Sequence, residues 1–351
     1  MGLLRLLLAI SVVSAHHQNH FIFYLVGGTV AVKTFYIISG FYMAMIINSY
    51  KDNISFYKSR YLRLFPVYFF CVLITFFLGE GATLYNVKLF DNDQIPFLTN
   101  IFLLFTNIFI FFQDVVLFIG VKGGDFFFTG NLHSSDLPLR YFLFIPQGWT
   151  LGLEISFYLI APFIIKKRNI KLIISIIFLS LLLRIILNLF DLKGDPWTYR
   201  FFPSELALFL LGSLSYYFFS NLKIKVSKKI IYLFFILISL MTVCYSFITI
   251  PGRSIIYFIL VACSLWFIFQ KTKNNKIDKF LGELSYPVYC SHFVVLHFIF
   301  YRVSFLNDEN LSFLNSLIIM FIVIVISVII YFIIHIPIDK YRKIYKKKWI
   351  K

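Results

Sequence analysis

Residues 312–336, with the sequence SFLNSLIIMFIVIVISVIIYFIIHI, contain no aspartate, glutamate, lysine or arginine. A helix that crosses a bilayer needs about 20 consecutive and mostly apolar residues. Because the bilayer core offers no water to the backbone, so long an apolar run must pair its own N–H and C=O groups, as a helix does. This stretch therefore predicts a transmembrane helix late in the chain.

Similar apolar runs occupy most of the 351 residues. We predict further spans at 3–24, 28–48, 61–79, 148–165, 169–190, 203–219, 229–249, 254–270 and 282–302. Apolar residues make up 60% of the sequence, against roughly 45–50% in soluble domains, and the mean hydropathy is +0.84. The fold class is therefore an all-α, polytopic membrane bundle with about ten transmembrane helices. It forms one domain over 1–340, followed by a basic tail over 341–351.

The formal net charge is +17, yet only 14% of the residues are charged. Lysine and arginine cluster in short runs between the apolar segments, at 51–63, 166–168, 223–229, 271–279 and 340–348. Basic loops of this kind stay in the cytoplasm, so the pattern predicts an integral protein of the cytoplasmic membrane with both termini inside. It argues against a nucleic-acid partner and indicates contact with membrane lipids.

Residues 95–119 are apolar enough to span, but the charge pattern opposes a single crossing. One crossing there would move the basic run 166–168 and all later ones outside, against the positive-inside rule. We therefore interpret 95–119 as re-entrant or interfacial, or as a tight double pass. Residues 80–147 then form the largest extracytoplasmic segment.

The four cysteines lie in apolar stretches without pairing or metal-binding spacing. Isolated cysteines in such surroundings are typical of small buried apolar residues. We expect no metal site.

Ionisable residues inside predicted spans are costly and point to function. Arg5 and His16 are eleven residues apart, which is three helical turns plus roughly 20°, so they share one helix face. His16 is a candidate base or nucleophile near neutral pH, the alternative being a hydrogen-bonded core histidine. Arg60 and Arg63 lie one turn apart at the inner mouth of the span 61–79. They can clamp phosphate or simply anchor the helix on lipid headgroups.

The later spans carry further candidates. Trp149 opens a segment in which Glu154 lies inside the outer face and Tyr158, one turn on, can donate a hydrogen bond to it. The alternative for Glu154 is a structural pair with an intramembrane arginine. Arg184 and His292 are two more buried polar positions. Arg184 is a candidate partner of a carboxylate, and polar contact between helices is the alternative for both.

Taken in order, these segments resemble acyltransferase family 3, the membrane O-acyltransferases of the O-antigen acetylase type. The resemblance covers most of the chain, from residue 4 to about residue 340. It is carried by Arg5-x10-His16, the Ser39-Gly40-Phe41 element, Arg60-x-x-Arg63-x-x-Pro66, Trp149-Thr150-Leu151 with Glu154 to Pro162, the Arg200-Phe201 and Leu211-Gly212 pairs, and the segment 281–292 that ends in His292.

The resemblance implies a donor and an acceptor. The donor is acyl-CoA, usually acetyl-CoA, from the cytoplasm, and the acceptor is a sugar hydroxyl of an extracytoplasmic polysaccharide or glycolipid, as in lipopolysaccharide, capsule or exopolysaccharide. Arg60 and Arg63 are then expected to bind the CoA phosphates, with Arg5 orienting the donor. His16 is expected to act as base or transient acyl carrier. Glu154 is expected to orient the sugar or tune His16.

The sequence departs from the family pattern in two places. Lys33 stands where many members have an acidic or small residue, and His335-Ile336-Pro337 replaces a glutamate near a proline. The rival function is a polysaccharide or lipid transporter, since transporters also carry polar groups inside helix bundles. Transporter folds are often built from inverted repeats. We find none in this sequence, which favours the enzyme.

Overall fold

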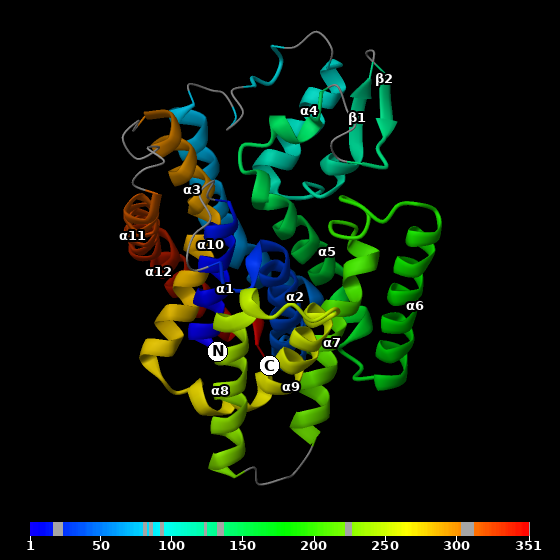
Figure 1. Ribbon diagram of the computed structural model, residues 1–351, viewed down its shortest axis with the longest axis vertical. Coiled ribbons are helices and arrows are strands. Elements are labelled where there is room, and N and C mark those ends of the chain that lie inside the picture. The colour runs from blue at the N-terminus through cyan, green and yellow to red at the C-terminus, as the bar shows by residue number, and fades with distance from the viewer. Residues whose placement is uncertain are drawn as a thin grey trace. The chain divides into compact units, whose positions relative to one another are not determined.

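The computed structural model describes residues 1–16, 24–79, 83, 87–91, 95–122, 125–131, 137–221, 227–302 and 312–350. The described part is mostly helical (Figure 1), and the strands β1 (Ile119–Lys122) and β2 (Asp125–Phe128) form one antiparallel hairpin. The helices are α1 (Gly2–Ala15), α2 (Gly27–Ile46), α3 (Asn53–Leu78), α4 (Phe97–Phe109), α5 (Trp149–Ile164), α6 (Ile170–Leu189), α7 (Phe202–Asn221), α8 (Lys228–Cys244), α9 (Arg253–Thr272), α10 (Lys276–Arg302), α11 (Ser312–Ile330) and α12 (Ile336–Trp349).

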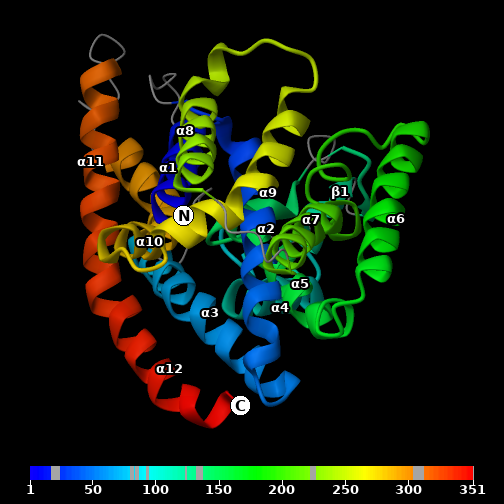
Figure 2. The same ribbon diagram turned by 90° about the horizontal axis from the view of Figure 1, so that it is seen from below.

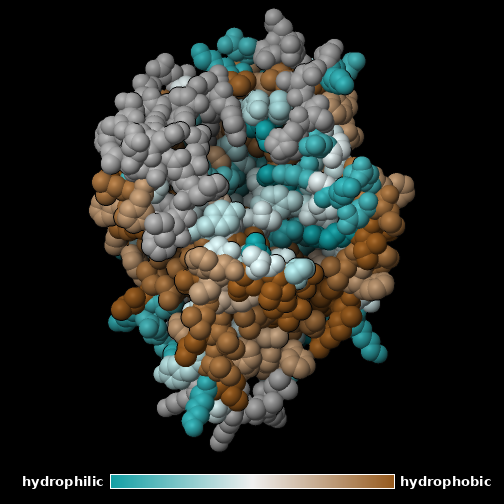
Figure 3. Space-filling view, in the orientation of Figure 1, coloured by the Kyte–Doolittle hydropathy of each residue, from teal (hydrophilic) through white to brown (hydrophobic). Residues whose placement is uncertain are grey.

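Within the described residues, six helical stretches are long and apolar enough to cross a membrane. They are Gly27–Ser49, Asn53–Leu78, Ile170–Leu189, Lys229–Phe247, Arg253–Thr272 and Phe313–Tyr345. Each of the predicted spans overlaps a helix, which confirms the all-α membrane bundle, while the count of about ten spans stays a prediction. Large apolar side chains are exposed along these helices (Figure 3), as expected where lipid replaces water.

Helix α4 lies within residues 95–119, the apolar segment that we interpreted as re-entrant, interfacial or a tight double pass. It has 13 residues, about 20 Å of helix, against a hydrocarbon core of about 30 Å. It ends at Phe109, and the next residue, Ile110, has a φ of +71°, a backbone conformation that a non-glycine residue rarely adopts. The α4 helix alone is therefore too short for a full crossing.

Contacts divide the chain into two compact units. Unit 1 comprises Met1–Tyr50, Ala161–Ile177 and Leu208–Ile333, and unit 2 comprises Lys51–Ile160, Phe178–Ala207 and Ile334–Lys351. In unit 1, α1 packs against α2 and α10, while α9 packs against α2 and α8 (Figures 1 and 2). In unit 2, α3 packs against α4 and α12.

In unit 1, α2 and α7 cross at two glycines. A Cβ atom on Gly40 would lie 1.7 Å from the carbonyl oxygen of Phe209, and one on Gly212 would lie 1.8 Å from that of Ile37. The Ser213 hydroxyl donates a hydrogen bond to the Gly40 carbonyl at 3.0 Å. Small residues let membrane helices approach this closely, so these glycines are required by packing.

Two predicted helix boundaries are wrong. The first helix ends at Ala15, with His16 as its C-cap, whereas a continuous helix was predicted over 3–24; residues 17–23 lie outside the described part. Helix α3 starts at Asn53, about two turns before the predicted start at 61, because the Asp52 carboxylate accepts the Ser55 N–H at 2.7 Å and caps the helix. The basic residues before residue 61 were interpreted as lying outside the helix, but lysine and arginine are good helix formers.

Candidate functional site

Helices α1 and α10 are held together at their N-termini. The Asp278 carboxylate accepts the backbone N–H groups of Gly2 at 2.8 Å and Leu3 at 3.0 Å, so a side chain of α10 caps α1. A Cβ on Gly282 would lie 2.9 Å from the Gly2 Cα and 3.5 Å from the Arg5 Nη1. Arg5 therefore lies beside the backbone of α10, at the glycine of the segment 281–292.

At the other end of α1, His16 meets His292. Their ring centroids are 5.5 Å apart and the ring planes are 25° from parallel. Phe293 contacts both, with centroids 4.5 Å from His16 and 5.0 Å from His292. His16 is exposed, whereas His292 is fully buried. The structure thus brings together two histidines that are 276 positions apart in the sequence.

The hydrogen bonds of His292 define its tautomer when it is neutral. Its Nδ1 lies 2.7 Å from the Tyr289 carbonyl oxygen, and a carbonyl only accepts, so Nδ1 carries the proton. The lone pair is then on Nε2, a buried atom with no hydrogen-bond partner among the described residues. A buried imidazole nitrogen without a protein partner is suited to a bound ligand.

In unit 2, the candidate residues of α3 and α5 share one cluster. The Tyr158 hydroxyl donates a hydrogen bond to the Glu154 carboxylate, as predicted. The guanidinium groups of Arg60 and Arg63 interact electrostatically with Tyr158. Tyr158 and Arg60 are buried, while Arg63 and Glu154 are half-buried. The two arginines are therefore neighbours of Tyr158, whose hydroxyl donates to Glu154. The sequence had suggested opposite ends of the membrane for the arginines and for Glu154.

Arg63 also borders a small cavity against α12. This cavity of about 10 Å³ has room for about one water molecule. Besides Arg63 it is lined by Leu62, Pro66, Val67, His335, Ile338, Asp339 and Arg342. His335, which stands where the family has a glutamate, thus lies on the same cavity as Arg63.

The N-terminal part of α5 packs on two polar side chains that sequence reasoning missed. A Cβ on Gly148 would lie 2.1 Å from the Gln113 Oε1, and one on Gly152 would lie 2.8 Å from the Asp114 Oδ1. Gln113 is fully buried and Asp114 is 7% exposed. The glycine at 152, inside the Trp149–Glu154 motif, was the signal that a backbone or side chain approaches closely there.

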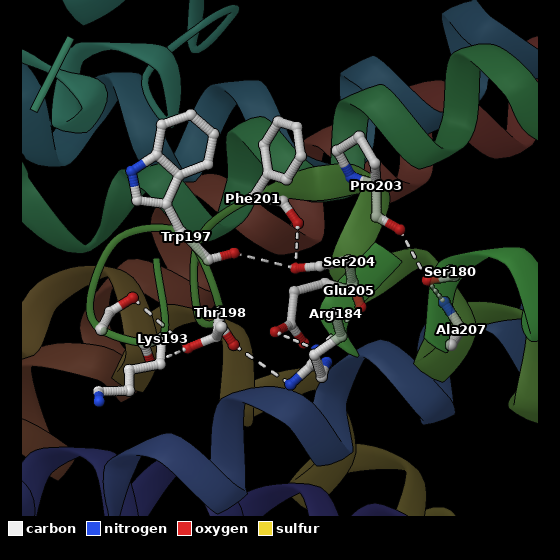
Figure 4. Close-up of polar contacts among 11 residues, drawn as sticks. Ser180, Arg184, Lys193, Trp197, Thr198, Phe201, Pro203, Ser204, Glu205 and Ala207 are labelled. Atoms are coloured by element: carbon white, nitrogen blue, oxygen red, sulfur yellow. Dashed lines mark hydrogen bonds and ion pairs between the residues drawn. The ribbon is translucent and has the colours of Figure 1, made fainter. Parts of the chain in front are cut away.

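Polar contacts hold the side chain of Arg184 in place, as Figure 4 shows. Its Nη2 donates to the Glu205 carboxylate and to the Ser204 carbonyl, both at 2.8 Å, and its Nη1 donates to the Thr198 carbonyl at 3.2 Å. Glu205 is fully buried. The suggested carboxylate partner of Arg184 therefore exists. The pair joins α6 to α7 and to the loop that connects them.

Trp149 is the first residue of α5 and is 5% exposed. Its ring packs edge-on against Tyr199, with centroids 5.0 Å apart.

Most of the predicted site residues fall into two groups. Unit 1 joins His16 to His292 at one end of α1 and places Arg5 nearer the other, and unit 2 gathers the cluster around Tyr158.

Comparison with known proteins shows the family of this chain. An acyltransferase domain, that of acyltransferase family 3, matches residues 1–332. An uncharacterized protein of Aquifex aeolicus (strain VF5) is 27% identical over 157 residues, which cover 43% of this chain and 69% of that protein. No solved structure matches. The chain therefore belongs to acyltransferase family 3 and is an integral membrane acyltransferase.

Proposed function

We propose that this acyltransferase transfers an acetyl group from cytoplasmic acetyl-CoA to a hydroxyl of an extracytoplasmic polysaccharide or glycolipid. The observation that carries the proposal is the contact between His16 and His292 at 5.5 Å. An exposed imidazole beside a buried one whose Nε2 has no hydrogen-bond partner among the described residues suits proton transfer and acyl transfer. Family membership and the apolar helices support the membrane setting.

The chemistry has two open forms. With His16 as general base, its nitrogen takes the proton of the sugar hydroxyl, the oxygen attacks the thioester carbonyl, and the CoA thiolate leaves and is reprotonated. With His16 as acyl carrier, its nitrogen first accepts the acetyl group and the sugar oxygen then displaces it. In both forms the products are an acetyl ester and free CoA.

Arg60 and Arg63 are proposed to bind the CoA phosphates, and Arg5 to orient the donor. A guanidinium forms paired, charge-assisted hydrogen bonds with phosphate oxygens. The interaction of both arginines with Tyr158 supports the idea that they face one polar site with Glu154. Glu154 is proposed to orient the acceptor hydroxyl by accepting a hydrogen bond from it.

Radiolabelled acetyl-CoA tests this function directly. Purified protein in detergent or proteoliposomes is mixed with surface glycan from the gene-deleted strain, from which mild alkali has removed esters. We expect alkali-labile label in the glycan, and loss of acetyl ester signals from the glycan of the deletion strain by NMR. Glycan that carries the same esters with and without the gene would contradict the proposal. Movement of unmodified glycan or lipid across vesicles without acetylation would favour the transporter.

A further inference from the structure

The loop between α6 and α7 carries an ion pair beside the start of α5. The Arg200 Nε lies 2.6 Å from the Asp195 Oδ1 and its Nη2 lies 2.9 Å from the Oδ2, so the contact is bidentate. The side chains are 16% and 28% exposed, respectively. Both partners are therefore held in a fixed geometry and still reach the surface of unit 2.

Two aromatic rings complete the cluster. The Arg200 guanidinium carbon is 4.3 Å from the ring centroid of Trp149 and 5.0 Å from that of Tyr199, within the range of cation–π contact. Trp149 opens α5, about 7.5 Å along the helix axis before Glu154. The loop side of this helix is the predicted extracytoplasmic side. The cluster therefore lies on the acceptor side of the carboxylate.

Arg200 uses fewer of its N–H donors than Arg184 does. A guanidinium has five N–H donors, and in the described part of the chain two of those of Arg200 bind Asp195, which leaves three. The donors of Arg184 reach two backbone carbonyls besides Glu205. Arg184 thus fixes the loop through two backbone carbonyls, whereas the described contacts of the Arg200 side chain leave N–H donors for a ligand.

The charge of the cluster selects the kind of ligand. Asp195 neutralises Arg200, and its carboxylate repels an approaching phosphate or carboxylate. A neutral pair of neighbouring hydroxyls can accept from the guanidinium and donate to the carboxylate, while aromatic rings cover the apolar face of the ligand. Resting on the proposed acetyltransferase function, we propose that Trp149, Asp195, Tyr199 and Arg200 form the subsite that binds a neutral sugar residue of the acceptor.

The test compares variants of this pair with a matched control. Arg200→Lys keeps the charge but not the fork, and Asp195→Asn keeps the shape but not the acceptor charge. The control variants Lys193→Ala and Asp191→Asn change an ion pair on the same loop, whose members are 69% and 85% exposed. Binding of the de-esterified glycan is measured by calorimetry without donor. The KM for glycan and the KM for acetyl-CoA are measured in the transfer assay.

We expect Arg200→Lys and Asp195→Asn each to weaken glycan binding and to raise its KM about tenfold. The KM for acetyl-CoA stays within about twofold, and the controls match wild type. Methyl glucoside should compete with the glycan better than glucuronate does. Unchanged glycan affinity in either variant, or stronger competition by glucuronate, overturns the subsite.

The binding assay separates the two proposals. Wild-type protein that binds glycan through this pair but transfers no acetyl group would refute the acetyltransferase function and keep the subsite. Acetyl transfer by both variants with an unchanged KM for glycan would refute the subsite and keep the acetyltransferase function.

Discussion

Replacing His16 by glutamine tests the reactive role of the histidine pair. Glutamine keeps a hydrogen-bonding side chain of similar length but has no imidazole nitrogen to accept a proton or an acetyl group. His16 is exposed, and the contacts of Asp278 and Gly282 with the first turn of α1 do not involve it, so α1 and α10 should stay packed after the change. We expect normal amounts of inserted protein and normal binding of acetyl-CoA.

The magnitude follows from the chemistry and the contact. General base catalysis contributes about 10²–10⁴-fold, so acetyl transfer should fall by at least about 10²-fold, or about 2.7 kcal/mol in the barrier. His292→Gln should also lower the rate, because it removes the Nε2 lone pair while its amide still donates to the Tyr289 carbonyl. The rings are 5.5 Å apart, so the two losses should be non-additive, and the double variant should be little slower than His16→Gln.

The assay is transfer of labelled acetyl to de-esterified glycan, with expression and donor affinity measured in parallel. His297→Gln, which changes a half-buried histidine later on α10, is the control and should keep near wild-type activity. A His16→Gln protein that retains more than about half of the rate would refute a base or carrier role. Strictly additive losses in the double variant would show that the two histidines act independently.

Three other outcomes are expected. Reporter fusions after residues 90, 140 and 168 should be outside, outside and inside, and an outside signal after 168 would mean that 95–119 crosses. Arg63→Ala should weaken acetyl-CoA binding about ten- to hundredfold, with partial recovery in Arg63→Lys, by calorimetry; unchanged affinity would leave only a lipid-anchoring role. Burial raises the pKa of Asp278, but the N–H groups of Gly2 and Leu3 and the charge of the amino terminus outweigh it and hold this pKa below its usual value. The stabilisation by Asp278 is therefore present above the unfolded-state pKa of about 3.9 and is lost as pH falls through the lower folded-state pKa. Thermal unfolding in detergent between pH 6 and 3 should show a steeper loss for wild type than for Asp278→Asn, and equal slopes would contradict this.

The sequence predicted the helices well because lipid-facing segments must be apolar over a fixed length. It also predicted local pairs, such as Tyr158 with Glu154, because residues four apart on a helix are neighbours. The start of α3 was missed because the N-cap at Asp52, and not the start of the apolar run at residue 61, determines where this helix begins. The end of α1 at Ala15 was missed because apolar residues resume at Phe21, after the polar stretch 17–20.

Tertiary contacts were beyond the periodicity of the sequence. His16 and His292 each stood out as ionisable groups in apolar runs, but nothing local indicates that they stack. Glu205 was overlooked as the partner of Arg184 because it lies at the start of α7, where a glutamate is an ordinary first-turn residue. Arg200 was noted only as part of a motif, since its pairing with Asp195 depends on the path of the loop.

The glycine crossing of α2 and α7 has a consequence for the electrical tightness of the membrane. The backbones touch so closely at Gly40 and Gly212 that not even a methyl group fits between them. A water molecule, with a radius of about 1.4 Å, is excluded for the same reason, so no file of water molecules can conduct protons between these helices there. We expect this crossing to insulate the bilayer at that point while a reactive histidine operates elsewhere in the same unit.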